Sequence, residues 1–327
     1  MKLEEIKQIS VLGAGVMGHG IAQAFIMGGY PVKLYDIQDA ILVTAQAHIE
    51  ESLELFRQVG LISERDLGGA VQRLTTTDDL AFASKGADFI VEAAPEDLDL
   101  KQQLFKQVEA LCADETIVAT NTSSLTLKEI SAHVENKARL VITHWFSPPQ
   151  IVPTVEVVKG EETSDETLET AYQLMEKIKK MPVRIDREVP GFLVNRIQVA
   201  MAREVFDLYE KGIASAQDID RAVIGSIGFR LASIGPLRAA DFNGIDIWSR
   251  AAKNLLPEIQ SSIELPEALR RLDAQGHRGI KSGRGFYEYT TSFSDTKLDK
   301  AVKARDLQFL ARLKDEYRDR PLKDEKE

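Results

Sequence analysis

The stretch ISVLGAGVMGHGIAQAFIMGGYPVKLYD, residues 9–36, decides the fold of this chain. It begins with an apolar run, which leads into Gly13, Gly15 and Gly18 at G-x-G-x-x-G spacing and then into a helical pattern. A second apolar run follows and ends in an acid, Asp36. Strand, glycine turn, helix, strand and acid stand here in the order of a dinucleotide-binding βαβ unit. We therefore predict a nucleotide site in this part of the chain.

The glycine fingerprint and the acid after it also indicate which dinucleotide binds. The three glycines provide a tight turn, close approach of a pyrophosphate and close packing of the helix on the strand. We expect the pyrophosphate at the N-terminus of the helix that begins with Val16 and Met17, where free N–H groups face it. Asp36 can accept hydrogen bonds from both ribose hydroxyls and would repel a 2′-phosphate, and residues 37–40 contain no Arg or Lys. The sequence thus predicts NAD rather than NADP.

Length and composition indicate a cytoplasmic protein of two domains. With 327 residues and 44% hydrophobic content, the chain can bury a large core. Its net charge of −10 disfavours binding to nucleic acid or to an anionic membrane surface. Cys112 has no partner for a disulfide, the N-terminus runs directly into the first strand, and no apolar run approaches membrane-spanning length. We expect a small-molecule substrate and neither nucleic acid nor membrane as a partner.

Short apolar runs alternate with helical patterns up to about residue 186. A helical pattern over residues 38–71 is interrupted at GLISERD, where Ser63 and Asp66 form a variant of the capping box. This alternation predicts a mostly parallel sheet covered on both faces. The run SPPQIVPTVEVVKG, residues 147–160, leaves no room for a helix after RLVITHWF, so the strands on either side of the proline-rich loop should pair antiparallel.

The predicted fold class is α/β: a Rossmann-like doubly wound sheet, mostly parallel with antiparallel last strands, plus an all-α C-terminal domain. We place the NAD-binding domain at 1–187 and a helical substrate-binding and dimerisation domain at 188–327. The amphipathic helices of residues 190–327 have more apolar surface than one small domain can cover, which predicts a homodimer. The charged tail from about Lys297 is predicted to be a solvated or subunit-packing helix.

Two residues on the predicted antiparallel pair can perform acid–base chemistry. His144 and Glu156 are twelve residues apart, so a wide hairpin can bring them face to face. A carboxylate on one imidazole nitrogen fixes the tautomer, stabilises the imidazolium and leaves the other nitrogen to take a proton. The alternative is a buried histidine satisfied by a neighbouring acid. A base beside a hydride acceptor is what alcohol oxidation needs, and the five histidines show no metal-ligand spacing, so we expect no metal.

Two polar segments can complete such a site. Asn121, Thr122, Ser123 and Ser124 end an apolar strand at the carboxyl edge of the sheet, where open α/β sheets bind ligands. Their alternative is a turn with an N-cap for the next helix. Asn195 lies in PGFLVNR, inside an apolar helix start near the domain boundary, where an amide is costly unless it is paired. Its alternative is a helix cap or an interdomain hydrogen bond.

The chain resembles the 3-hydroxyacyl-CoA dehydrogenase family over nearly its whole length. GAGVMGHGIA, VEAAPEDLDLK, NTSSL, HWFSPPQIVPTVEVV, PGFLVNR and KSGRGFYEY occur in the family's order. The resemblance implies NAD-dependent oxidation of the 3-hydroxyl of an (S)-3-hydroxyacyl-CoA to the 3-oxoacyl-CoA. It implies His144 as base, Glu156 as its orienting acid, and Ser123 and Asn195 as donors to the substrate oxygen. The residues that it implies around the cofactor and substrate are Glu96, Lys101, Asn121, Ser147 and Lys281.

Three departures from the acyl-CoA pattern concern the substrate. Ser147 replaces the asparagine of the family's H-F-F-N-P, and FRQVGLISERD lacks the lysines that family members use there to hold CoA phosphate. The third is Arg230 in GFRLASIGPL. This motif resembles the L-gulonate 3-dehydrogenase and lambda-crystallin branch, which oxidises a free 3-hydroxy acid of the L-gulonate or carnitine type.

Arg230 is the residue that bears most on the choice between these two substrates. An arginine fork binds a carboxylate through two N–H bonds, so Arg230 can anchor a free acid; its alternative is a surface or interdomain ion pair. NTSSL and KSGRGFYEY favour the acyl-CoA branch, which we place slightly ahead. A non-catalytic NAD-binding structural protein is a third interpretation, and the presence together of His144, Glu156, Ser123 and Asn195 disfavours it.

Overall fold

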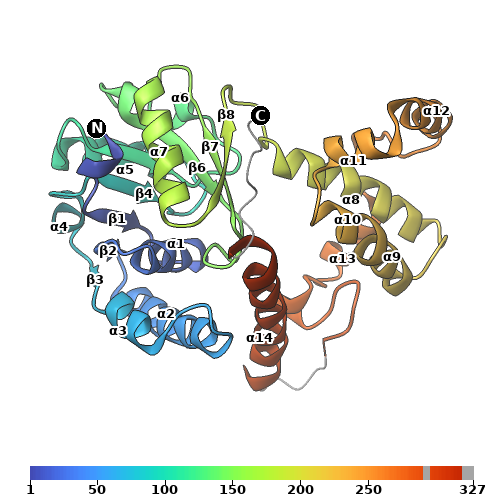
Figure 1. The fold of residues 1–327 in the computed structure, drawn as a ribbon, viewed down its shortest axis with the longest axis horizontal. Coiled ribbons are helices and arrows are strands. Elements are labelled where there is room, and N and C mark those ends of the chain that lie inside the picture. Colours follow the sequence, from blue (N-terminus) through green and yellow to red (C-terminus); the bar gives the residue numbers. More distant parts are fainter. Residues whose placement is uncertain (290–294, 319–327) are drawn as a thin grey trace. The chain divides into compact units, whose positions relative to one another are not determined.

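The computed structural model describes residues 1–289 and 295–318, and the chain divides into two units. The first unit comprises Met1–Phe192 together with Arg305–Glu327, and the second comprises Leu193–Ala304. An eight-stranded sheet lies in the first unit, and the second is helical (Figure 1). No helix in the described ranges is both long and apolar enough to cross a membrane.

The sheet of the first unit has the order β3-β2-β1-β4-β5-β6-β7-β8. Its strands are β1 (Ile9–Leu12), β2 (Val32–Tyr35), β3 (Leu74–Thr77), β4 (Phe89–Glu92), β5 (Ile117–Thr120), β6 (Leu140–Trp145), β7 (Thr154–Val158) and β8 (Met181–Ile185). The pairs from β3 to β6 are parallel, β7 pairs antiparallel with β6, and β8 runs parallel to β7. The predicted doubly wound sheet with antiparallel last strands is confirmed.

Helices cover both faces of this sheet. They are α1 (Val16–Met27), α2 (Asp39–Gln58), α3 (Glu64–Val71), α4 (Leu80–Ser84), α5 (Leu98–Leu111), α6 (Leu127–Ile130) and α7 (Asp165–Lys177). One buried core lies between the sheet and α1, α2, α3 and α7, and a second lies under α4, α5 and α6. The predicted capping box is present, because the Ser63 side chain accepts from the Asp66 amide while the Asp66 carboxylate accepts from the Ser63 amide.

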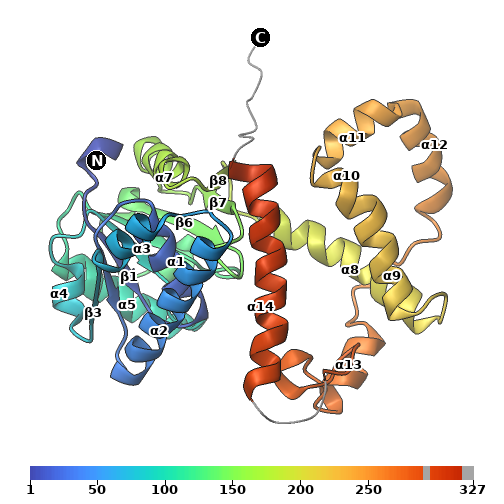
Figure 2. The same ribbon diagram turned by 60° about the horizontal axis from the view of Figure 1, so that its bottom comes forward.

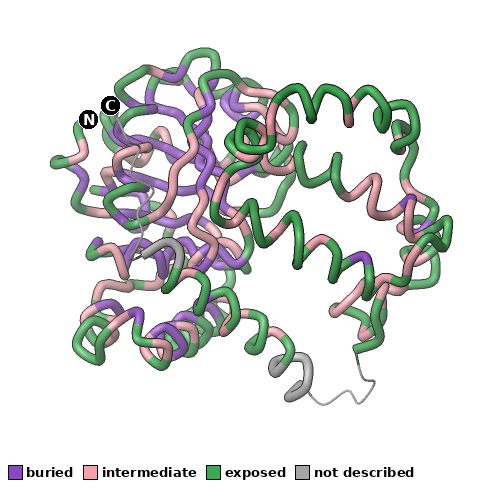
Figure 3. Tube along the Cα trace, turned by 45° about the vertical axis from the view of Figure 1, so that its right-hand side comes forward, coloured by how far each residue is buried: buried purple, intermediate pink, exposed green. Residues whose placement is uncertain are grey.

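The second unit consists of helices with little buried surface. They are α8 (Val194–Glu210), α9 (Ala216–Ala222), a π-helical turn (Val223–Gly228), α10 (Phe229–Leu231), α11 (Pro236–Asn243), α12 (Ile245–Leu255), α13 (Glu267–Ala274) and a 3-10 turn (Ile280–Ser282). Within the part of this unit whose burial is described, only Asp207, Ile219 and Ala268 are buried (Figure 3). Its helices therefore lack a substantial core of their own.

The C-terminal helix corrects two expectations. α14 (Asp295–Arg312, dark red in Figure 2) was expected to be solvated or to pack on another subunit, as part of the second domain. Instead, residues from Arg305 onward belong to the first unit, where Leu310 is fully buried in a cluster with Leu55, Phe56, Leu61 and Ile151. This part of the chain packs on the first unit because it has a narrow stripe of leucines on one face. The many charged residues around this stripe make it hard to recognise in the sequence. Residues beyond 318 lie outside the described part of the chain.

Candidate active site

The glycine turn after β1 has the form that a dinucleotide requires. Gly13 has a φ of 103°, which disfavours any other residue, and a Cβ on Gly18 would collide with the carbonyl of Gly13. Gly15 is the N-cap of α1, and a Cβ there would meet open space. Because no side chain caps α1, its first N–H groups are free to receive a phosphate. Val16 is 70% exposed and Met17 is half-buried beside this end.

Asp36 lies where the cofactor ribose is expected. Its Oδ2 accepts a hydrogen bond of 2.9 Å from the Ala14 amide, and its Oδ1 accepts one of 3.1 Å from the Gln38 amide. The end of β2 is thereby tied to the glycine turn, and the carboxylate remains half-exposed. Open glycine turn, uncapped helix end and acid at the end of β2 together fit NAD.

His144 and Glu156 form the dyad that the hairpin geometry predicts. They stand directly opposite each other in the antiparallel pair of β6 and β7. His144 Nδ1 lies 2.7 Å from Glu156 Oε2, and the two residues are 5% and 0% exposed. The carboxylate therefore occupies Nδ1, and Nε2 is the ring nitrogen outside this hydrogen bond.

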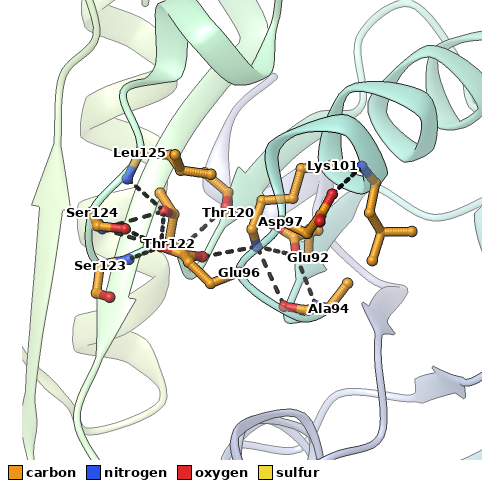
Figure 4. Close-up of polar contacts among 11 residues, drawn as sticks. Glu92, Ala94, Glu96, Asp97, Lys101, Thr120, Thr122, Ser123, Ser124 and Leu125 are labelled. Atoms are coloured by element: carbon orange, nitrogen blue, oxygen red, sulfur yellow. Dashed lines mark hydrogen bonds and ion pairs between the residues drawn. The ribbon is translucent and has the colours of Figure 1, made fainter.

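Glu96 organises the loop that carries Ser123 (Figure 4). Its Oε1 accepts from the Thr122 hydroxyl at 2.6 Å, from the Ser123 and Ser124 amides at 3.1 Å each, and from the Ser124 hydroxyl at 2.8 Å. Partial burial acts to raise the pKa of Glu96, but these hydrogen bonds and the charge of Lys101 outweigh it and lower the pKa. An ionised Glu96 thus fixes the loop backbone, and Ser123 stays exposed.

Lys101 lies in a buried ion pair behind Glu96. Its side chain is 1% exposed, and its Nζ lies 2.6 Å from Glu92 Oε1 and 3.3 Å from Glu96 Oε2 (Figure 4). Glu92, at the end of β4, also accepts from the Thr120 hydroxyl at 2.6 Å. Lys101 is thus enclosed in a buried ion pair with Glu92, next to the Glu96 carboxylate. Its ion pair with Glu96 holds that carboxylate in place, and Glu96 in turn holds the loop of Ser123.

Two further residues predicted near the cofactor follow β5 and β6. Asn121 is tied to the strand of His144, because its Oδ1 accepts a 2.9 Å hydrogen bond from the Trp145 amide. The amide side chain therefore joins the ends of two neighbouring strands. Ser147 is exposed and precedes Pro148 in a cis peptide bond.

The loop between β6 and β7 is held by Lys180, a residue that no sequence pattern identified. The ammonium group donates to the carbonyls of Pro149 at 2.5 Å and Val152 at 2.9 Å, and lies 5.3 Å from the centre of the Trp145 ring. Although the residue as a whole is only half-buried, desolvation of the ammonium lowers the pKa of Lys180 to about 7. The proline-rich segment that joins His144 to Glu156 is thereby held in place.

Three predicted residues belong to the second unit and are described by their own surroundings. Asn195 is half-buried in the first turn of α8, and Lys281 is exposed in the turn at 280–282. Arg230 is exposed, and its contacts are two 3.3 Å hydrogen bonds to the carbonyl and hydroxyl of Ser226. No carboxylate among the described residues forms an ion pair with Arg230, so the alternative of a surface ion pair finds no support there.

The chain matches two family models along most of its length. Residues 8–189 match the 3-hydroxyacyl-CoA dehydrogenase NAD binding domain, and residues 191–289 match the C-terminal domain of the same family. The chain belongs to the 3-hydroxyacyl-CoA dehydrogenase family. It is an NAD-dependent oxidoreductase, as the glycine turn and Asp36 had indicated.

Two relatives of this chain are named for different kinds of substrate. The chain is 32% identical over 308 residues to 5-formyl-3-hydroxy-2-methylpyridine 4-carboxylate 5-dehydrogenase of Mesorhizobium japonicum. The alignment covers 94% of this chain and 98% of that protein. A solved structure of a dehydrogenase of this name, an NAD⁺-dependent dismutase, has a TM-score of 0.86 at 30% identity and covers 94% of this chain and 97% of that one. The chain is 34% identical over 286 residues to a probable 3-hydroxybutyryl-CoA dehydrogenase of Bacillus subtilis. That alignment covers 87% of this chain and 98% of the relative.

Proposed function

We propose that this protein oxidises the hydroxyl group of a small free acid, with His144 as the general base. Glu156 holds Nδ1, so Nε2 of His144 takes the hydroxyl proton, and the carboxylate stabilises the imidazolium that forms. When bound, NAD would supply the hydride acceptor for this oxidation. Ser123 and Asn195 donate hydrogen bonds to the substrate oxygen; the loop of Ser123 is fixed for this by Glu96.

The observation that carries the choice of a free acid is the position of α14. It covers the turn between α2 and α3, where acyl-CoA enzymes of this family hold the CoA phosphate. Leu310 is fully buried against that turn, and in the π-helical turn that follows α14 (Leu313–Arg318), Lys314 Nζ donates to the Val59 carbonyl at 2.9 Å. Exposing one such leucine alone costs about 1.5–3 kcal/mol. The family models end at residue 289, so this cover lies beyond the part of the chain that they describe.

The charge of the helical hairpin formed by α2 and α3 also disfavours binding of CoA. Residues 39–71 contain no lysine and only two arginines, Arg57 and Arg65, against six acids. Arg57 is already paired with Glu54 and Glu64. The acids are Asp39, Glu50, Glu51, Glu54, Glu64 and Asp66. An acidic surface of this kind repels a polyphosphate.

Arg230 and the comparisons give further support. An exposed arginine without a carboxylate partner can receive the carboxylate of a free substrate. The Mesorhizobium relative is named for a pyridine carboxylate, a small acid without CoA. A 3-hydroxyacyl-CoA, which the sequence places slightly ahead, is here the second candidate; NTSSL, KSGRGFYEY and the Bacillus relative favour it.

Formation of NADH on a substrate panel tests this proposal. The panel contains (S)-3-hydroxybutyrate, L-gulonate, L-carnitine and a hydroxymethylpyridine carboxylate, with (S)-3-hydroxybutyryl-CoA beside them. We expect turnover of at least one free acid and little of the thioester. Turnover of the thioester alone would overturn the free-acid assignment. NADH binding without turnover of any compound would favour the structural NAD-binding protein.

We expect NAD to exceed NADP in kcat/KM by roughly 10- to 1,000-fold, because the Asp36 carboxylate repels a 2′-phosphate at a cost of several kcal/mol. Steady-state kinetics with both cofactors measures the ratio. Asp36→Asn removes the negative charge and should lower the ratio of kcat/KM with NAD to kcat/KM with NADP. A wild-type preference for NADP would show that Asp36 does not face the ribose.

We further propose that the protein is a homodimer formed through the second unit. This unit exposes many large apolar side chains and buries few. A second copy of the chain that packs on this surface would cover them. They include Ile197, Val199, Phe229, Leu237, Phe242, Ile247 and Trp248.

Light scattering should give twice the 36.4 kDa chain mass. Phe242→Glu should produce a monomer, because it places a charge on this apolar surface. Phe82→Glu, at an exposed phenylalanine of the first unit, should leave the dimer intact. A wild-type monomer at every concentration would refute the dimer.

A further inference from the structure

Phe192, the last residue of the first unit before the chain enters the second, has a backbone conformation that is rare for an aromatic residue. Its φ is 47°, directly after Gly191 at 75°. Only one other non-glycine residue of the described ranges, Lys179, has a positive φ. The left-handed conformation costs a residue with a Cβ about 1–2 kcal/mol. Residues held in this way concentrate where function requires them.

The segment that contains Phe192 is tied firmly to the first unit. The Phe192 amide donates to the Val189 carbonyl at 2.9 Å, which closes a turn. Just before it, Glu188 Oε1 accepts a 2.7 Å hydrogen bond from the Leu127 amide at the start of α6. The Phe192 side chain is 3% exposed and packs in the core under α4, α5 and α6. These contacts hold the strained residue in its conformation.

The ring of Phe192 lies against the imidazole of His144. Their ring centres are 5.4 Å apart, with the planes inclined at 56°. Phe146 approaches the same imidazole at 4.7 Å and 67°. The hydrogen bond to Glu156 fixes Nδ1 but leaves the ring free to tilt about that contact. Two aromatic neighbours at van der Waals range remove this freedom.

We propose that Phe192 is a positioning residue for His144. Its ring holds the imidazole in the orientation from which Nε2 takes the substrate proton, and the left-handed backbone is what places the ring there. A glycine would relieve the backbone but would remove the ring. This inference rests on the proposed role of His144 as base, through which Phe192 acts.

A double-mutant cycle tests whether Phe192 acts through His144. Phe192→Leu keeps an apolar side chain, and we expect it to lower kcat on (S)-3-hydroxybutyrate, or on the best free acid of the panel, by about 10- to 100-fold, the effect of misplacing a reacting group by about 1 Å. KM and the dissociation constant of NADH should change less than about twofold. In the His144→Gln background the same substitution should cause no further loss.

Two further variants separate the ring from the backbone and from general packing. Phe192→Gly relieves the left-handed strain and should still lose at least as much kcat as Phe192→Leu, because the ring is absent. Phe105→Leu, at a buried phenylalanine of the same core on α5, should lower the melting temperature and leave kcat unchanged.

Histidine-labelled protein gives a readout that needs no substrate. The chain has five histidines, and the His144 resonance is identified by its absence from His144→Gln. The nuclear Overhauser contacts between the His144 and Phe146 rings do not depend on the ring current of Phe192; they should change in Phe192→Leu and stay the same in Phe105→Leu.

An unchanged kcat together with unchanged contacts between the His144 and Phe146 rings in Phe192→Leu would overturn the inference. So would an equal loss of kcat in the His144→Gln background, since Phe192 would then act by another route. If His144→Gln itself kept near-normal turnover, the proposed role of His144 as general base would be wrong, and with it the proposed function. A slow His144→Gln beside a normal Phe192→Leu would refute only the role of Phe192.

Discussion

Replacing His144 by glutamine is expected to lower kcat by about 10²- to 10⁴-fold, the range for loss of a general base. Glutamine keeps the size of the side chain but cannot take the hydroxyl proton. NADH binding should change little, because the glycine turn and Asp36 lie on other strands of the sheet. Steady-state kinetics and NADH fluorescence titration provide the two measurements.

The chain offers a matched control for this substitution. His133→Gln makes the same exchange at an exposed histidine of the first unit and should leave kcat unchanged. Glu156→Gln should act in the same direction as His144→Gln, because the imidazolium loses its carboxylate partner. Near-normal turnover in His144→Gln would show that the dyad is structural.

Replacing Arg230 by methionine should cost about 2–5 kcal/mol in kcat/KM on the free acid. This corresponds to a fall of roughly 30- to 4,000-fold, because a charge-assisted bidentate contact is lost and a carboxylate is left unpaired. Methionine keeps an unbranched apolar stem like that of arginine and removes the charged fork.

Arg238→Met is the control for Arg230, because Arg238 is an exposed arginine of the same unit. It should change kcat/KM less than about twofold. Activity on (S)-3-hydroxybutyryl-CoA that survives Arg230→Met, with no activity on free acids, would assign the thioester and exclude the carboxylate role of Arg230.

The parts of the fold that follow local periodicity could be predicted from the sequence. The glycine spacing and the flanking apolar runs determine the βαβ start within 28 residues, 9–36. The short loop after β6 excludes a helix and so predicts the antiparallel pairing that brings His144 to Glu156. Each of these inferences needs only spacing and side-chain type.

The features that escaped prediction depend on side-chain direction and on distant contacts. Lys101 stands on α5 next to polar residues, and only the structure shows that it turns back to Glu92. The leucine stripe of α14 packs on residues some 250 positions earlier, such as Val59. The positive φ of Phe192 leaves no trace in the sequence, because phenylalanine is not a residue that favours it.

The most direct test of the free-acid proposal is the ratio of kcat/KM for a matched pair of substrates, (S)-3-hydroxybutyrate and (S)-3-hydroxybutyryl-CoA. The two compounds share the same carbinol centre, and one ends in a free carboxylate where the other carries the CoA thioester, so the ratio reports the combined effect of α14, the acidic hairpin and Arg230. We predict that the free acid exceeds the thioester by at least about 10-fold, or 1.4 kcal/mol. A preference for the thioester would contradict the proposal.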